Sequence, residues 1–110
     1  MKPAVLRPQA LRDQQYQARC YRKDAGPPLA VKAVKAINAA LDQIEFDPGI
    51  GSPLMGKVLG IAGLRTWHVT KFPLLWFYLE RNDHLDVVRL LGECQDLAAI
   101  LSAHAEIAGT

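Results

Sequence analysis

The stretch from Gly63 to Leu101 decides the fold of this chain. It reads GLRTWHVTKFP (63–73), LLWFYLE (74–80), ND (82–83), HLDVVRLL (84–91) and GECQDLAAIL (92–101). Three short runs rich in aromatic and β-branched residues are separated by turn residues, a pattern typical of consecutive antiparallel strands. Asn82 and Asp83 suit a tight two-residue turn, because both residue types tolerate positive φ. Pro73 lies between the first two runs, where a missing backbone donor does little harm. We therefore expect a three-stranded meander.

The middle strand of this meander, Leu74 to Glu80, is apolar on both of its faces, which is typical of a central strand covered on both sides. In the last strand, 84–91, the odd and even positions are expected to face opposite sides of the sheet. The large apolar side chains of the meander are assigned to the core: Trp67, Leu75, Trp76, Phe77, Tyr78, Leu79, Val87 and Leu91.

The N-terminal half predicts a short strand and two helices. Ala4-Val5-Leu6 is the candidate strand, and a helix is expected from Gln9 to Asp24, because this segment lacks Gly and Pro. Gly26-Pro27-Pro28 ends that helix. A second helix is expected from about Ala30 to Phe46, packed antiparallel on the first as a helical hairpin. The predicted buried positions are Leu11, Ala18 and Tyr21 in the first helix and Val31, Val34, Ile37, Leu41 and Ile44 in the second.

Residues 50–63 are rich in glycine and are expected to be mostly loop, anchored to the core by Leu54, Val58 and Leu59. The predicted fold class is therefore α+β: an N-terminal strand, an antiparallel helical hairpin and a three-stranded antiparallel meander that forms a small sheet. With 110 residues, the whole chain is expected to be a single domain.

Composition narrows the class of protein. Half of the residues are hydrophobic, which favours a folded chain, and no apolar run approaches the ~20 residues that span a bilayer. No signal peptide is visible, so we expect a cytoplasmic protein with no membrane partner. Cys20 and Cys94 fit no metal-ligand spacing and are expected to be free thiols.

Charge is distributed unevenly along the chain. Residues 1 to 35 hold eight basic side chains against two acidic ones, a net charge of +6, so the rest of the chain carries −4 of the overall +2. Four residues of the first predicted helix share one face at helical spacing: Arg12, Tyr16, Arg19 and Lys23. Such a face suits an acidic partner or nucleic acid, although a merely solvated face is equally compatible with the pattern.

Sequence motifs for catalysis and cofactor binding are missing. There is no phosphate-binding loop, dinucleotide-binding loop, nucleophile elbow or paired metal-ligand motif. The three histidines, His68, His84 and His104, are spread over a strand, a strand start and the C-terminal tail. The sequence therefore predicts no cofactor, no metal and no catalytic residues.

Several pieces of the chain, taken in order, carry a resemblance to a known family. They are Gly-Leu-Arg at 63–65, Val69, Phe-Pro at 72–73, an apolar run that contains Phe-Tyr at 77–78, Val-Val-Arg-Leu-Leu at 87–91, and Asp-Leu at 96–97. In this order they resemble the ParE/RelE superfamily of type II toxin–antitoxin systems, over nearly the whole chain. The resemblance implies the same α+β fold and a toxin held inactive by a cognate antitoxin, which is expected to be encoded by the adjoining gene.

The superfamily has two functional branches. RelE-like members cut messenger RNA on the ribosome with several basic side chains and a C-terminal Tyr. Here Leu74, Leu75, Thr66 and His68 stand where those nucleases place basic residues, so RNA cleavage is disfavoured. The resemblance leans to the ParE-like branch, whose members poison DNA gyrase. A RelE-like ribonuclease and a non-toxic interaction module remain alternatives.

The resemblance and the polar residues of the meander together predict two binding surfaces. The target-binding surface comprises Arg65, Lys71, Arg81, Arg89, Gln95 and Asp96. Arg65 also suits an ion pair with Asp86 or Asp96, and Arg89 one with Asp96. Many relatives have His and Arg where this chain has Gly92 and Gln95, which leaves its toxicity open. The antitoxin is expected on Arg12, Tyr16, Arg19 and Lys23, in a complex that is either a toxin–antitoxin hetero-oligomer or built on a homodimer.

Overall fold

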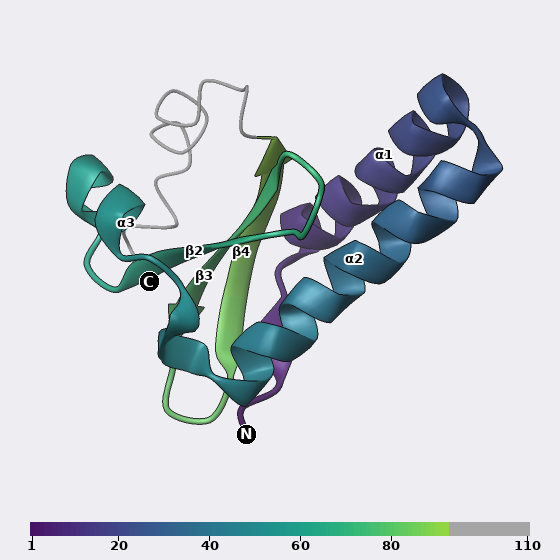
Figure 1. Ribbon diagram of the computed structural model, residues 1–110. Coiled ribbons are helices and arrows are strands. Elements are labelled where there is room, and N and C mark those ends of the chain that lie inside the picture. The colour runs from purple at the N-terminus through teal and green to yellow at the C-terminus, as the bar shows by residue number, and fades with distance from the viewer. Residues whose placement is uncertain (93–110) are drawn as a thin grey trace.

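The computed structural model describes residues 1–92 and shows an α+β fold, as the sequence predicts (Figure 1). Its elements in chain order are β1 (Ala4–Leu6), α1 (Pro8–Ala25), α2 (Pro27–Phe46), the 3-10 helix η1 (Pro48–Ile50), α3 (Leu54–Leu59), β2 (Leu64–His68), β3 (Leu74–Glu80) and β4 (Leu85–Gly92). The helix α3 corrects the expectation that residues 50–63 are mostly loop.

The four strands form one mixed sheet in the order β1-β4-β3-β2. The predicted meander is confirmed, because β3 pairs antiparallel with both β2 and β4 and is therefore a central strand. The short strand β1 pairs with β4 in parallel, with Ala4 opposite Leu85. The N-terminal strand thus completes a sheet made mostly of later residues.

The turn between β3 and β4 is as short as predicted, since the Arg81 amide donates to the His84 carbonyl at 2.9 Å across Asn82 and Asp83. Neither turn residue adopts a positive φ, although both residue types tolerate it. In the described part of the chain the non-glycine residue with positive φ is Lys71, at 69°, in the loop between β2 and β3.

A β-bulge in β4 breaks the predicted alternation of that strand. Phe77 pairs with Arg89 but Tyr78 pairs with Val87, so Val88 is an extra residue. As a result Val87 and Leu90 belong to one core cluster, and Val88 and Leu91 to the other.

The helices α1 and α2 form an antiparallel hairpin that crosses one face of the sheet (Figure 1). Gly26 alone connects them, at φ 91°, and its amide donates to the Arg22 carbonyl at 3.2 Å. The predicted buried stripes are partly wrong, because Leu11 and Val31 are about half exposed. Ile37 and Ile44 of α2 are buried as predicted. The other buried apolar positions of the two helices are alanines: Ala10 in α1 and Ala30, Ala33 and Ala40 in α2.

Two core clusters lie on opposite faces of the sheet. The larger joins the hairpin to β3 and β4, and the Trp76 indole there donates to the Ile37 carbonyl of α2 at 3.1 Å. The smaller contains Leu64, Phe77, Leu79, Val88 and Leu91, with Met55 and Leu59 of α3 packed against it. The second face of the central strand therefore has the cover that its apolar sequence requires.

Candidate functional site

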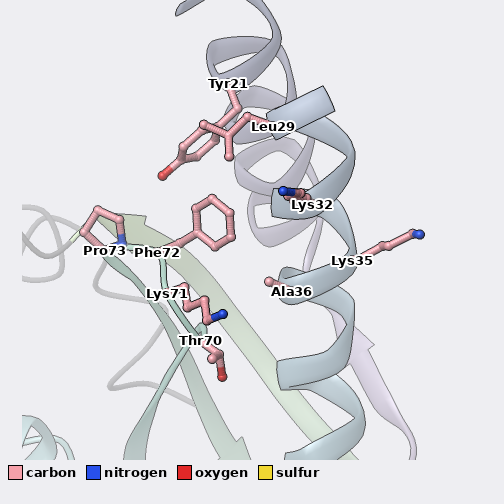
Figure 2. A pocket seen from close by; sticks show the side chains of 9 residues that line it. All are labelled: Tyr21, Leu29, Lys32, Lys35, Ala36, Thr70, Lys71, Phe72 and Pro73. Atoms are coloured by element: carbon pink, nitrogen blue, oxygen red, sulfur yellow. The ribbon is translucent and has the colours of Figure 1, made fainter. Parts of the chain in front are cut away.

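A hollow lies between the hairpin and the loop that joins β2 to β3 (Figure 2). Its volume is about 800 Å³. Tyr21 of α1 and the N-terminal half of α2 form one side, and residues 70–73 of the loop form the other. We call it the lysine groove, and its lining residues are Tyr21, Leu29, Lys32, Lys35, Ala36, Thr70, Lys71, Phe72 and Pro73.

The loop wall of the groove is fixed by backbone hydrogen bonds. The Phe72 amide donates to the Val69 carbonyl at 3.2 Å, and the Val69 amide donates to the Leu74 carbonyl at 3.0 Å. This tight path requires the left-handed conformation of Lys71. It also directs the Phe72 ring against Tyr21, edge to face, with the ring centroids 5.2 Å apart. The aromatic pair therefore ties the loop to the helical hairpin.

The charge around this apolar hollow has a single sign. Lys32, Lys35 and Lys71 are exposed, and no acidic residue is among the described residues that line the groove. Figure 2 shows Lys71 reaching toward Ala36, whereas Lys35 extends outward into solvent. Burial raises the pKa of Tyr21 above its usual value, so its phenol stays neutral at physiological pH. The groove therefore suits a ligand that is apolar at its centre and negatively charged at its margin.

The predicted target-binding residues are not gathered in one place. Lys71 lines the lysine groove, while the Arg65 guanidinium donates to the Gly51 carbonyl at 2.7 Å. Arg65 therefore holds the segment before α3 and does not form the expected ion pair with Asp86. Gln95 and Asp96 lie outside the described residues.

Asp86 pairs instead with Arg7 and Arg81. The Arg7 guanidinium donates to both carboxylate oxygens at 2.8 Å, and Arg81 Nη2 donates to Oδ2 at 3.1 Å. The hydrogen bond from Arg7, followed by that from Arg81, lowers the pKa of Asp86 below its usual value, against the opposing effect of burial. This cluster joins the start of α1 to the end of the sheet.

Arg89 is largely buried, with 12% of its side chain exposed, and it pairs with Asp13 of α1. Arg89 Nε and Nη2 donate to the two oxygens of Asp13 at 2.6 and 3.0 Å, and the Leu90 amide donates to Asp13 Oδ2 at 3.1 Å. The premise that Arg89 is an exposed polar group of the meander is therefore wrong. Sequence patterns do not indicate this pair, because its partners are 76 residues apart.

The predicted antitoxin face is exposed along its whole length. Arg12, Tyr16, Arg19 and Lys23 are all solvent-exposed on α1, as helical spacing requires. A hydrogen bond with the Cys20 thiol raises the pKa of Tyr16 above its usual value. These four residues do not line the lysine groove, which α1 reaches through Tyr21.

Comparison with protein families identifies the family of this chain. The family model described as "ParE toxin of type II toxin-antitoxin system, parDE" matches residues 4–97. The chain belongs to the ParE toxin family. The match spans both the helical hairpin and the sheet, so it includes every element that builds the lysine groove.

Solved structures show the same fold. A chain from the structure titled "Chromosomal ParDE TA system from P. aeruginosa" aligns with a TM-score of 0.70 and 20% identity, covering 84% of this ParE-family chain and 96% of the other. A search of the curated proteins gave no match. No helix within residues 1–92 of the ParE-family chain is long and apolar enough to cross a membrane.

Two of the positions at which this ParE-family chain lacks the basic residues of the RelE-like branch lie in the sheet. Leu74 is buried in the main core cluster, and Thr66 lies in β2, where its backbone pairs with Ser52. Across the described residues, no group of three or more His, Cys, Asp or Glu side chains is placed to hold a metal ion.

Proposed function

We propose that this toxin is neutralised by a cognate antitoxin whose apolar, acidic segment docks in the lysine groove. The observation that carries this proposal is the combination of an apolar hollow of about 800 Å³ with three lysines around it. An apolar side chain gains free energy by leaving water for such a hollow. Carboxylates beside that side chain would meet Lys32, Lys35 and Lys71.

The exposed basic face of α1 has a different role in this proposal. Its four predicted residues lie outside the groove, so they contribute long-range attraction and not a binding hollow. Charges at the margin of an interface act chiefly on the association rate, whereas groups buried in the interface act on the dissociation rate. Antitoxin binding thus uses the face of Arg12, Tyr16, Arg19 and Lys23 for steering and the lysine groove for retention.

Surface-plasmon or stopped-flow binding of the purified antitoxin separates the two roles. Lys32→Glu with Lys35→Glu should raise the dissociation rate, while Arg19→Glu with Lys23→Glu should mainly slow association and weaken its salt dependence. Lys57→Glu, an exposed lysine on α3, is the control for charge reversal. Unchanged dissociation in the groove variant would refute docking at the lysine groove.

We further propose that the cellular target is DNA gyrase, which rests on the resemblance to the ParE-like branch. Of the predicted target residues within 1–92, Arg65, Arg81 and Arg89 already hold internal hydrogen bonds. Lys71 is the member of the set that is exposed on a loop, and an antitoxin seated in the lysine groove would cover it. Target binding and neutralisation would then compete for the same lysine.

The test is supercoiling by purified gyrase with and without the toxin, together with growth after induction. Inhibition should be relieved by antitoxin and weakened by Lys71→Asn, which removes the charge and keeps a residue type that tolerates positive φ. Full gyrase activity at a large molar excess of the toxin, together with normal growth, would refute gyrase inhibition and favour the alternative of a non-toxic interaction module. Codon-dependent cuts in messenger RNA would favour the RelE-like alternative. Inhibition that survives Lys71→Asn but fails on truncation after Leu91 would move the site to the segment with Gln95 and Asp96.

A further inference from the structure

A second exposed surface lies at the other end of α2, where the helix meets η1. Phe46, the last residue of α2, is 79% exposed, and the side chains of Met1 and Ile50 beside it are also exposed. Together they border a shallow hollow of about 660 Å³. A cluster of exposed apolar side chains of this kind is typical of an interaction surface. We call it the Phe46 end.

The charge of the Phe46 end is opposite to that of the lysine groove. Asp42, Glu45 and Asp47 line it, and no Lys or Arg does so among the described residues. Glu45 is partly used within the fold, because its carboxylate accepts a hydrogen bond from the Ala4 amide at 2.6 Å. Asp42 and Asp47 are exposed, and neither forms an ion pair with another described residue. The Phe46 end is therefore an aromatic side chain flanked by two available carboxylates.

We propose that the Phe46 end of one copy of this chain docks into the lysine groove of a second copy. The two surfaces are complementary in chemistry, since a projecting aromatic residue with carboxylates beside it meets an apolar hollow with lysines around it. Phe46 would pack near Leu29 and Phe72, and Asp42 and Asp47 would face Lys32, Lys35 and Lys71.

One copy cannot make this contact within itself. Lys32 and Phe46 are fourteen residues apart on one continuous helix, which separates them by about 21 Å. Each copy therefore offers one surface of each kind, at opposite ends of α2. A contact between two different surfaces joins copies head to tail, and it builds a closed ring or an open filament.

This self-association and the proposed antitoxin docking share the lysine groove, so each would exclude the other. The two proposals still fail separately. If the toxin self-associates but the antitoxin does not bind at the groove, the antitoxin proposal fails and this inference holds. If the antitoxin binds at the groove but the toxin stays monomeric, this inference fails and the antitoxin proposal holds.

Sedimentation velocity of the purified full-length chain over a range of concentrations and salt tests the inference. The wild-type chain should associate reversibly, more weakly at high salt because exposed charges are screened. Phe46→Ala should weaken association at least about tenfold, as expected for removing one buried aromatic anchor. Val58→Ala on α3, which truncates another exposed apolar side chain, should have no effect.

A charge exchange provides the sharper test. One variant carries Lys32→Glu and Lys35→Glu, and the other carries Asp42→Lys and Asp47→Lys. Each variant alone then has two surfaces of like charge and should be monomeric, whereas an equimolar mixture should associate again in alternation. A monomeric wild-type chain at the highest attainable concentration, association that survives Phe46→Ala, or a mixture that stays monomeric would each overturn the inference.

Discussion

The ion pair between Asp13 and Arg89 offers the most demanding test of how the hairpin is held on the sheet. Asp13 is 8% exposed and accepts hydrogen bonds from the Arg89 guanidinium and the Leu90 amide. Asp13→Ala removes this carboxylate while the guanidinium stays largely buried. Breaking a buried pair from one side costs about 3–5 kcal/mol of unfolding free energy. For a domain of this size a loss of 3 kcal/mol lowers Tm by at least about 12 °C.

Urea unfolding followed by circular dichroism measures this cost. Asp24→Ala, which removes an exposed carboxylate from the same helix, is the control and should change stability little. The double variant Asp13→Leu with Arg89→Met should be more stable than Asp13→Ala, because it leaves no buried charge, although the Leu90 amide still loses a partner at about 1–3 kcal/mol. A loss below about 1 kcal/mol in Asp13→Ala would show that the pair behaves as an exposed one and would refute the reasoning.

Two further predictions concern α3 and the Asp86 cluster. Gly56→Ala should destabilise the protein by about 1–3 kcal/mol, because a Cβ there would lie 2.5 Å from the Leu64 carbonyl oxygen. Thermal unfolding measures the loss. Gly60→Ala is the comparison, because a Cβ there meets no atom within 4 Å and only the positive φ adds strain. The lowered pKa of Asp86 means that its contribution to stability is present above its unfolded-state pKa of about 3.9 and is lost as pH falls through the folded-state pKa. Asp86→Asn should therefore lower stability at neutral pH and flatten the acid limb of the stability–pH curve, and parallel curves for the two proteins would contradict this.

The sequence predicted the elements of the fold better than the faces that they bury. Hydrophobic runs, and the Gly and Pro residues between them, locate both helices and the meander, because each of these signals depends only on residues near one another in the sequence. The predicted buried stripe of α2 comprises Val31, Val34, Ile37, Leu41 and Ile44. The structure buries Ile37 and Ile44 as predicted, but it buries Ala30 and Ala33 in place of Val31 and Val34. A stripe drawn through the large apolar side chains does not detect buried alanines, because alanine is also common on exposed helix faces.

The candidate site was predictable only in part, for a similar reason. Exposure of Arg12, Tyr16, Arg19 and Lys23 follows from helical periodicity alone. The role of Arg89 depends on Asp13, and the bulge at Val88 shifts the facing of β4, so neither could be derived from strand alternation. The lysine groove joins α2 to the loop at Lys71, two segments that only the tertiary fold brings together.

The parallel pairing of β1 with β4 has a consequence for synthesis on the ribosome. The partner of Ala4 is Leu85, so the N-terminal strand must wait for roughly 80 residues to be added, about 4 to 16 s at ordinary elongation rates. During this time the helical hairpin can form from local contacts, but the side of Ile37 and Ile44 that later contacts β3 and β4 has no sheet to cover it. A nascent chain of this protein therefore passes through a stage with an uncovered apolar helix face, and the sheet closes only after β4 has left the exit tunnel.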